Sequence, residues 1–173
     1  MADETQQQQP QPENPVDPLI LKAALQRLRS EQNLVLAVLA GGAAALLGAC
    51  VWAAITFATS FQIGWMAVGV GFLVGYAVRT FGKGVDKSFA VVGAVWSFGG
   101  CAVGNLLSVI GVISTRQDIP FFDILEKLNL EIVASLMQAT FSPMDLLFYG
   151  IAVYEGYRFS FRPVTQADLM KIG

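Results

Sequence analysis

The chain has 173 residues, a formal net charge of −2 and no histidine. Hydrophobic residues make up 54% of it and charged residues only 14%, whereas soluble domains carry about 25% charged residues. This composition predicts an all-α membrane protein, and the missing histidine excludes Ser-His hydrolases, histidine-ligated haem and ordinary histidine metal sites.

The first part of the chain predicts a tail followed by a short helix. Residues 1–18 combine a glutamine run and four prolines with few apolar side chains, which is typical of a disordered cytoplasmic tail. Residues 19–32 then predict an amphipathic juxtamembrane helix that carries Leu21, Leu25 and Leu28 on one face. This helix either lies on the inner leaflet or continues into the first span without touching lipid.

Two uncharged stretches are long enough to cross a membrane. No charged residue occurs over the 47 residues 32–78 or over the 28 residues 88–115. Because a bilayer core takes about 20 helical residues, the first stretch holds two spans and the second holds one. The most polar part of the first stretch, residues 58–64, is the predicted turn between its two spans. The predicted spans are residues 33–57, 61–78 and 88–113.

Both the second and the third span carry glycines at intervals of seven, four and seven residues. At about 100° per residue, the resulting distances of seven, eleven and eighteen residues from the first glycine return to the same helix face within about 20°. In a membrane such a glycine stripe lets two helices approach closely, as in the GxxxG contact. The last glycine of each series, Gly82 or Gly111, alternatively serves as a turn residue. The predicted helix-packing glycines are Gly64, Gly71, Gly75, Gly93, Gly100 and Gly104.

Residues 120–141 predict an amphipathic helix between the third and fourth spans. Apolar residues from Phe121 to Ala139 follow helical spacing, and charged and polar residues fall mostly on the other faces. Such a helix is expected to lie at the membrane surface or against the bundle.

The fourth span is predicted at residues 143–161. Ser142 as N-cap, Pro143 at the first helical position and Asp145 two positions later form a variant of the capping box. A competing span at residues 132–154 is less favourable, because it would place Asp145 near the middle of the bilayer.

The distribution of Lys and Arg predicts the orientation. With the N-terminus in the cytoplasm, nine of the eleven basic residues fall on the cytoplasmic side. Only Arg116 and Lys127 lie outside, where acidic residues outnumber them. Both termini, including a cytoplasmic tail at residues 162–173, and the loop at residues 79–87 are therefore expected inside.

Two polar side chains fall at membrane depth, where they are costly and suggest function. Asn105 is expected to hydrogen-bond across the glycine contact, or else to line a permeation path. Glu155 is expected to pair with Arg79 or Arg158 near the inner interface and to serve assembly. The alternative role for Glu155 is a proton relay.

The remaining motifs argue against chemistry. Cys50 and Cys101 lie in separate spans and form no CxxC motif, and the glycines that flank Lys83 form a turn instead of a phosphate-binding loop. We therefore expect no catalytic residue, no metal site, no cofactor and no nucleic-acid partner.

The stretch Val74–Gly84, followed by a glycine-rich apolar span, resembles a pattern of small multi-pass bacterial inner-membrane proteins. The helix that begins with Asp145–Phe148 and leads into a basic tail is similar to the way those proteins end. The resemblance extends from Val70 to Arg162, implies an inner-membrane location and the same topology, and assigns no reaction.

These observations together predict a structural or accessory subunit with four transmembrane helices and one amphipathic helix. Its expected partners are the lipid bilayer and either a second copy of the chain or other membrane subunits. The alternative is a small transporter or channel subunit that uses Glu155 and Asn105.

Overall fold

The computed structural model describes residues 18–59, 61 and 63–170, so most of the predicted N-terminal tail lies outside the described residues. All regular secondary structure in these residues is helical, which confirms the all-α prediction. The helices are α1 (Pro18–Glu31), α2 (Leu34–Thr59), α3 (Trp65–Gly82), α4 (Lys87–Gln117), α5 (Phe121–Glu126), α6 (Leu130–Thr140), α7 (Pro143–Phe159) and α8 (Gln166–Met170).

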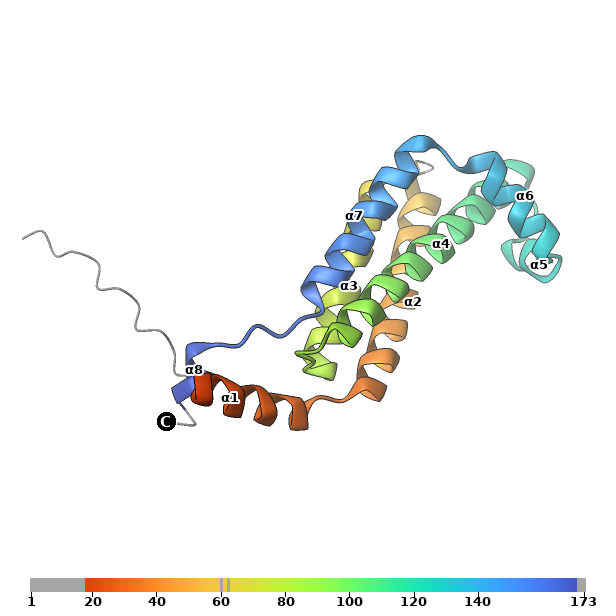
Figure 1. Ribbon diagram of the computed structural model, residues 1–173. Helices are drawn as coiled ribbons and strands as arrows, with labels where there is room; N and C mark the ends of the chain where they lie inside the picture. The colour runs from red at the N-terminus through yellow and green to blue at the C-terminus, as the bar shows by residue number, and fades with distance from the viewer. Residues whose placement is uncertain (1–17, 60, 62, 171–173) are drawn as a thin grey trace, which may run out of the picture.

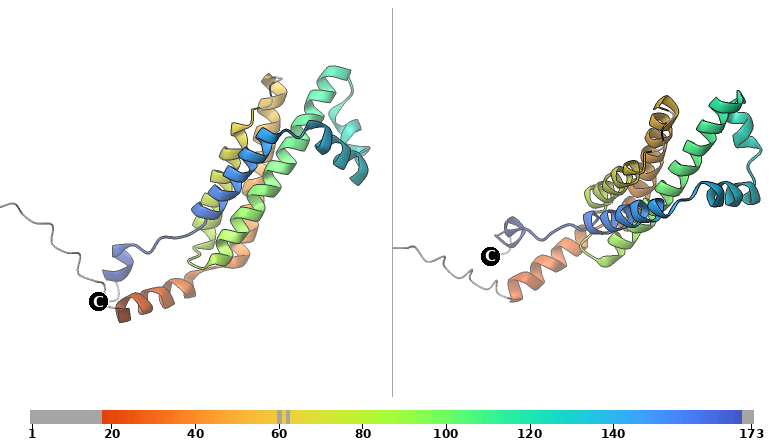
Figure 2. Two further views of the ribbon diagram at one scale, coloured as in Figure 1. Left: turned by 45° about the horizontal axis from the view of Figure 1, so that its top comes forward. Right: turned by 90° about the horizontal axis from the view of Figure 1, so that it is seen from above.

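The helices α2, α3, α4 and α7 pack into a bundle (Figure 1). α3 and α4 contact each other, and α2 and α7 each pack against both of them; among the described residues, no Cα atom of α2 lies within 8 Å of one in α7. α1 leaves one end of the bundle at an angle and contacts α8, whereas α5 and α6 project at the other end and pack on α4 (Figures 1 and 2). The two ends of the bundle therefore carry different attachments.

Three of the bundle helices, α2, α3 and α4, are long and apolar enough to cross a membrane. Their outer faces expose large apolar residues, such as Leu39, which is 64% exposed, and Val95, which is 63% exposed. α7 has 17 residues and is shorter than each of these three helices. By length and composition, three of the described helices, not four, qualify as membrane spans.

α3 and α4 each end at a residue with a left-handed backbone conformation, and both helices extend beyond the ends predicted from the sequence. α3 continues beyond predicted residue 78 until Lys83 adopts a left-handed conformation with φ of 51°. α4 likewise continues beyond predicted residue 113 until Asp118, with φ of 53°. A charged residue ends an apolar stretch without ending a helix, whereas a left-handed residue closes the last turn.

The prediction of one amphipathic helix over residues 120–141 is wrong, because the chain forms α5 and α6 there. The Asn129 side chain accepts a hydrogen bond from the Ile132 backbone N–H at 2.7 Å and thereby caps α6. Asparagine competes in this way for backbone donors, so it starts a new helix where the apolar spacing alone predicts continuation.

The predicted start of the helix after Ser142 is confirmed. Ser142 and Asp145 form a capping box, in which the Ser142 backbone N–H donates to Asp145 Oδ2 at 2.8 Å, and Pro143 occupies the first helical position. These contacts satisfy backbone donors that the first turn of α7 leaves without helical partners.

Candidate functional site

Three of the predicted packing glycines that lie within α3 and α4 contact α7. An ideal Cβ at Gly71 would lie 2.5 Å from the Ala152 carbonyl oxygen, and one at Gly75 would lie 2.9 Å from Phe159 Cβ. A Cβ at Gly93 would collide with Ser160 Oγ and with a backbone oxygen of α7. At these three glycines, α3 and α4 thus lie too close to α7 to leave room for a side chain.

The other two glycines within α4 contact α2. A Cβ at Gly100 would lie 3.2 Å from Ala45 Cα, and one at Gly104 would lie 3.3 Å from Ala49 Cα. Gly64 precedes α3, and a Cβ there would lie 2.5 Å from the Phe148 ring. One glycine series of α4 therefore contacts two partner helices, α7 at its beginning and α2 further along.

A row of buried polar side chains runs along α4. Ser97, Cys101, Asn105 and Ser108 are each at most 1% exposed, and their spacing of four, four and three residues places them on one helix face. From the sequence, only Asn105 was expected to be a functional polar group at membrane depth, and Cys101 was considered only as a cysteine outside any CxxC motif, although this polar spacing within an apolar helix is visible in the sequence. We call these four residues the polar row.

Asn105 is connected to α7 through Tyr149. The Tyr149 hydroxyl donates to the Cys101 carbonyl oxygen at 3.1 Å, and the Asn105 side chain is a further hydrogen-bond partner of Tyr149. Cys101 Sγ in turn lies 3.7 Å from the Ala67 carbonyl oxygen of α3. The middle of the polar row therefore joins α4 to both α3 and α7.

Other buried polar atoms have no hydrogen-bond partner among the described residues. They are Trp52 Nε1, Thr56 Oγ1, Ser97 Oγ, Ser108 Oγ and Glu155 Oε2. Leaving a buried polar group unpaired costs about 1–3 kcal/mol, so these atoms are the ones that would gain most from a bound water or ligand.

The expected ion pair of Glu155 with Arg79 or Arg158 does not form. Arg158 Nη1 instead donates to the Tyr154 hydroxyl at 3.4 Å, one helical turn earlier on α7. Arg79 lies on α3 and lines a cleft near Glu31. The prediction was wrong, because Arg158 contacts Tyr154 instead and Arg79 lines the cleft without pairing with Glu155.

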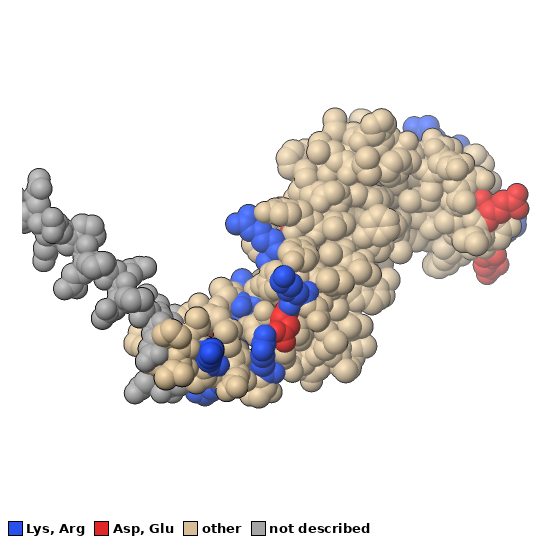
Figure 3. Space-filling view, in the orientation of Figure 1, with Lys and Arg blue, Asp and Glu red and all other residues tan. Residues whose placement is uncertain are grey.

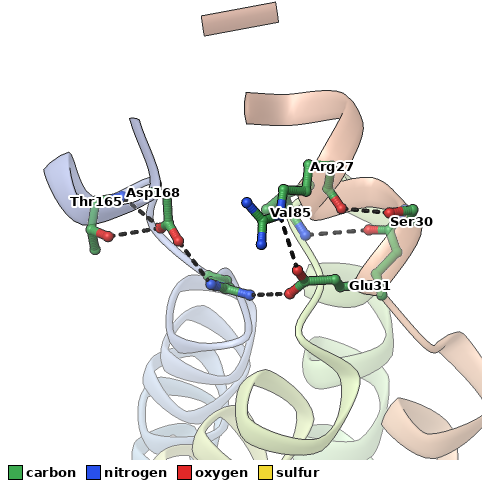
Figure 4. Close-up of polar contacts among 8 residues, drawn as sticks. Arg27, Ser30, Glu31, Val85, Thr165 and Asp168 are labelled. Atoms are coloured by element: carbon green, nitrogen blue, oxygen red, sulfur yellow. Dashed lines mark hydrogen bonds and ion pairs between the residues drawn. The ribbon is translucent and has the colours of Figure 1, made fainter. Parts of the chain in front are cut away.

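A polar network joins α1 to the α3–α4 loop and to the chain after α7. Asp86 accepts from Arg29 Nε at 3.1 Å and from Gln32 Nε2 at 2.6 Å. Arg162 donates to Glu31 at 3.4 Å and to Asp168 at 3.1 Å. Figure 4 shows that Asp168 comes from the chain after α7 and Glu31 from α1, so this pair of bonds joins the two segments. The network fixes α1 across one end of the bundle.

A cleft of about 510 Å³ opens beside this network. In Figure 3, Lys and Arg side chains gather around α1 and the adjoining end of the bundle, and Asp and Glu stand out at the α5–α6 end. The cleft is lined by Glu31, Tyr76, Arg79, Thr80, Lys83 and Arg162. Three cationic side chains and one carboxylate make it a candidate site for an anion.

No protein family, curated protein or solved structure matches the chain. Among the described residues, no group of three or more Cys, Asp or Glu side chains gathers closely enough to hold a metal ion. The fold itself is an all-helical bundle with three helices long and apolar enough to cross a membrane, which is compatible with an integral membrane protein.

Proposed function

We propose that the chain is an integral membrane protein of four spans that serves as a structural or accessory subunit in a bacterial inner membrane. The observation that carries this proposal is the apolar outer surface of α2, α3 and α4, helices that are long enough to cross a bilayer. Contiguous apolar surface of this extent is unfavourable in water, whereas lipid covers it without penalty.

The packing of α7 supports its assignment as the fourth span. Its 17 residues measure about 26 Å at 1.5 Å per residue, somewhat less than a bilayer core of about 30 Å. α7 contacts α3 and α4 at backbone distance through Gly71 and Gly93, so it runs beside two helices that qualify as spans. A helix in this position shares their depth in the membrane.

The distribution of charge supports termini on the cytoplasmic side. α1, the α3–α4 loop and the segment after α7 meet at the end of the bundle where Lys and Arg gather. Positively charged segments of this kind stay in the cytoplasm, and the more acidic α5–α6 end is then outside.

Two features support an accessory role. The packing glycines are covered by neighbouring helices, and the charged residues of α1 are bound largely by other residues of the chain. Such side chains hold a fixed structure together. The expected partners are lipid and either a second copy of the chain or other membrane subunits, with no enzymatic reaction.

A small transporter or channel subunit is the second candidate, and the unpaired polar atoms favour it. Ser97, Ser108 and Thr56 are buried in the bundle without a hydrogen-bond partner in the described part of the chain, and Glu155 adds a carboxylate. Polar groups of this kind line hydrated pathways in membrane proteins.

Reporter fusions test the four-span topology. An enzyme that is active only outside the cytoplasm is expected to be active when fused after Gln117 or Thr140, and inactive after Lys83 or Gly173. The reason is that the positive end of the bundle stays inside and α7 returns the chain to it. Equal activity after Thr140 and Gly173 would show that α7 does not cross the membrane.

Glu155→Gln separates the two candidate functions. Because Glu155 forms no ion pair with any residue that the structure describes, we expect thermal stability in detergent to stay within about 1 kcal/mol of the original protein, and assembly to be unchanged. Arg158→Gln, on the same helix, is the matched control and is expected to behave alike. Loss of a proton-driven substrate flux in a stable, assembled Glu155→Gln variant would instead establish the transporter.

A further inference from the structure

The cleft beside α1 has the features of an anion site at the membrane surface. We propose that it binds the phosphate group of an anionic membrane lipid, with the acyl chains against the outer face of α3. This inference rests on the proposed embedding of α3 in the membrane. The residues that carry it are Arg79, Lys83, Tyr76 and Thr80.

Two cations in the cleft are available for a ligand. The Arg79 guanidinium and the Lys83 ammonium make no ion pair or hydrogen bond with any described residue, whereas Arg162 is bound by Glu31 and Asp168. A guanidinium binds phosphate oxygens through two parallel hydrogen bonds, and an ammonium adds a point charge. Arg79 and Lys83 together therefore match one phosphate group.

The position of these cations along α3 matches the depth of lipid headgroups. Arg79 is the first charged residue after the 47 uncharged residues 32–78 and lies in the last turn of α3. Basic pockets at the cytoplasmic ends of spans are the sites where anionic headgroups bind. In the proposed orientation, the cleft faces the inner leaflet.

One face of α3 continues from the cleft into an apolar surface. Phe72, Tyr76 and Thr80 follow at intervals of four residues, so they lie in line along the helix. Phe72 is 44% exposed, its neighbour Leu73 is 42% exposed, and Tyr76 is 67% exposed. This surface suits an acyl chain and a glycerol backbone, and a free phosphate ion would leave it unused.

The helix itself does not attract the anion. The cleft lies at the C-terminal end of α3, where the helix dipole is negative and disfavours an anion. Arg79 and Lys83 must therefore supply the attraction, which makes binding depend strongly on these two side chains.

Lipid titration followed by native mass spectrometry tests the proposal on the full chain in detergent. We expect phosphatidylglycerol to bind about tenfold more tightly than zwitterionic phosphatidylcholine, because a net negative headgroup gains from both cations. The double variant Arg79→Gln/Lys83→Gln is expected to lose about this tenfold preference. If the unsubstituted protein bound the two lipids equally, the proposal would be overturned by this measurement alone.

The matched control removes two charges at the other end of the bundle. Arg116→Gln/Lys127→Gln is expected to keep the preference for phosphatidylglycerol; an equal loss in both double variants would show general charge attraction and overturn the site. Inorganic phosphate is expected to displace no more lipid than chloride of the same ionic strength. Stronger displacement by phosphate would make the soluble ion the ligand and overturn the assignment to lipid.

Two further measurements keep the outcomes distinct. Circular dichroism checks that the double variants keep their helix content, and Arg79→Lys, which keeps the charge but loses the planar donor pair, is expected to bind with intermediate affinity. Extraction of the membranes with alkaline carbonate tests the embedding separately. A chain that stays in the membrane but shows no lipid preference contradicts the lipid site alone, whereas a chain that is released contradicts the proposed function.

Discussion

Replacing Gly71 by leucine is expected to lower the free energy of unfolding by about 3 kcal/mol, the upper part of the range for overpacking. A Cβ at this position would lie 2.5 Å from the Ala152 carbonyl oxygen and 2.8 Å from its Cα. Backbone atoms cannot rotate away as a side chain can, so α7 as a whole must move. Thermal unfolding in detergent, followed by circular dichroism, measures the loss.

Gly69→Leu is the matched control for this substitution. Gly69 lies two residues earlier on the same helix, and an added Cβ there would meet no atom within 4 Å. We expect a change of at most about 0.5 kcal/mol, as for other exposed sites. If the two leucine variants lost the same stability, the close approach of α3 and α7 would be absent in the folded protein.

Replacing Trp52 by alanine is expected to cost about 3 kcal/mol, through the cavity that it leaves between α2 and α4. Trp52 is only 2% exposed, and its Cε3 would lie 2.9 Å from a Cβ at Gly104. Its indole nitrogen makes no hydrogen bond with a described residue, so the cost comes from lost packing alone. In a membrane this packing is the main attraction between helices.

Trp65→Ala controls for the loss of a tryptophan as such. Trp65 is 69% exposed, and its main partner is the Phe148 ring, whose centroid lies 5.5 Å away. An aromatic pair contributes about 1 kcal/mol, so we expect a loss of this size, measured in the same unfolding assay. Equal losses for Trp52 and Trp65 would contradict the tight packing of α2 on α4.

The apolar helices could be predicted because the length of an uncharged, apolar stretch can be read directly from the sequence. The predicted first span, residues 33–57, differs from α2 by one residue at its start and two at its end. The ends of α3 and α4 could not be found in this way. Lys83 and Asp118 adopt left-handed conformations that glycine usually provides; lysine gives no local sign of this, and aspartate, although it adopts this conformation more often than most residues, occurs far more often elsewhere.

The candidate site was harder to predict because its contacts join distant parts of the chain. The seven-residue glycine spacing defines a helix face, but it does not reveal that Gly93 meets α7 and Gly100 meets α2. Asp86 pairs with Arg29, which lies 57 residues earlier, and no local pattern connects the two. The expected pair of Glu155 with a nearby arginine failed for the same reason, since the fold decides which charges become neighbours.

The network around α1 has a consequence for the order in which the chain assembles during synthesis. The bonds of Asp86 to Arg29 and Gln32 span 57 and 54 residues, so they can form while the ribosome is still making α4. The contact between Arg162 and Glu31 spans 131 residues and must wait until α7 has been completed. Since chains begin to fold from the N-terminus as they emerge, α1 is attached first to the α3–α4 loop. The segment after α7 then closes the structure as the last step.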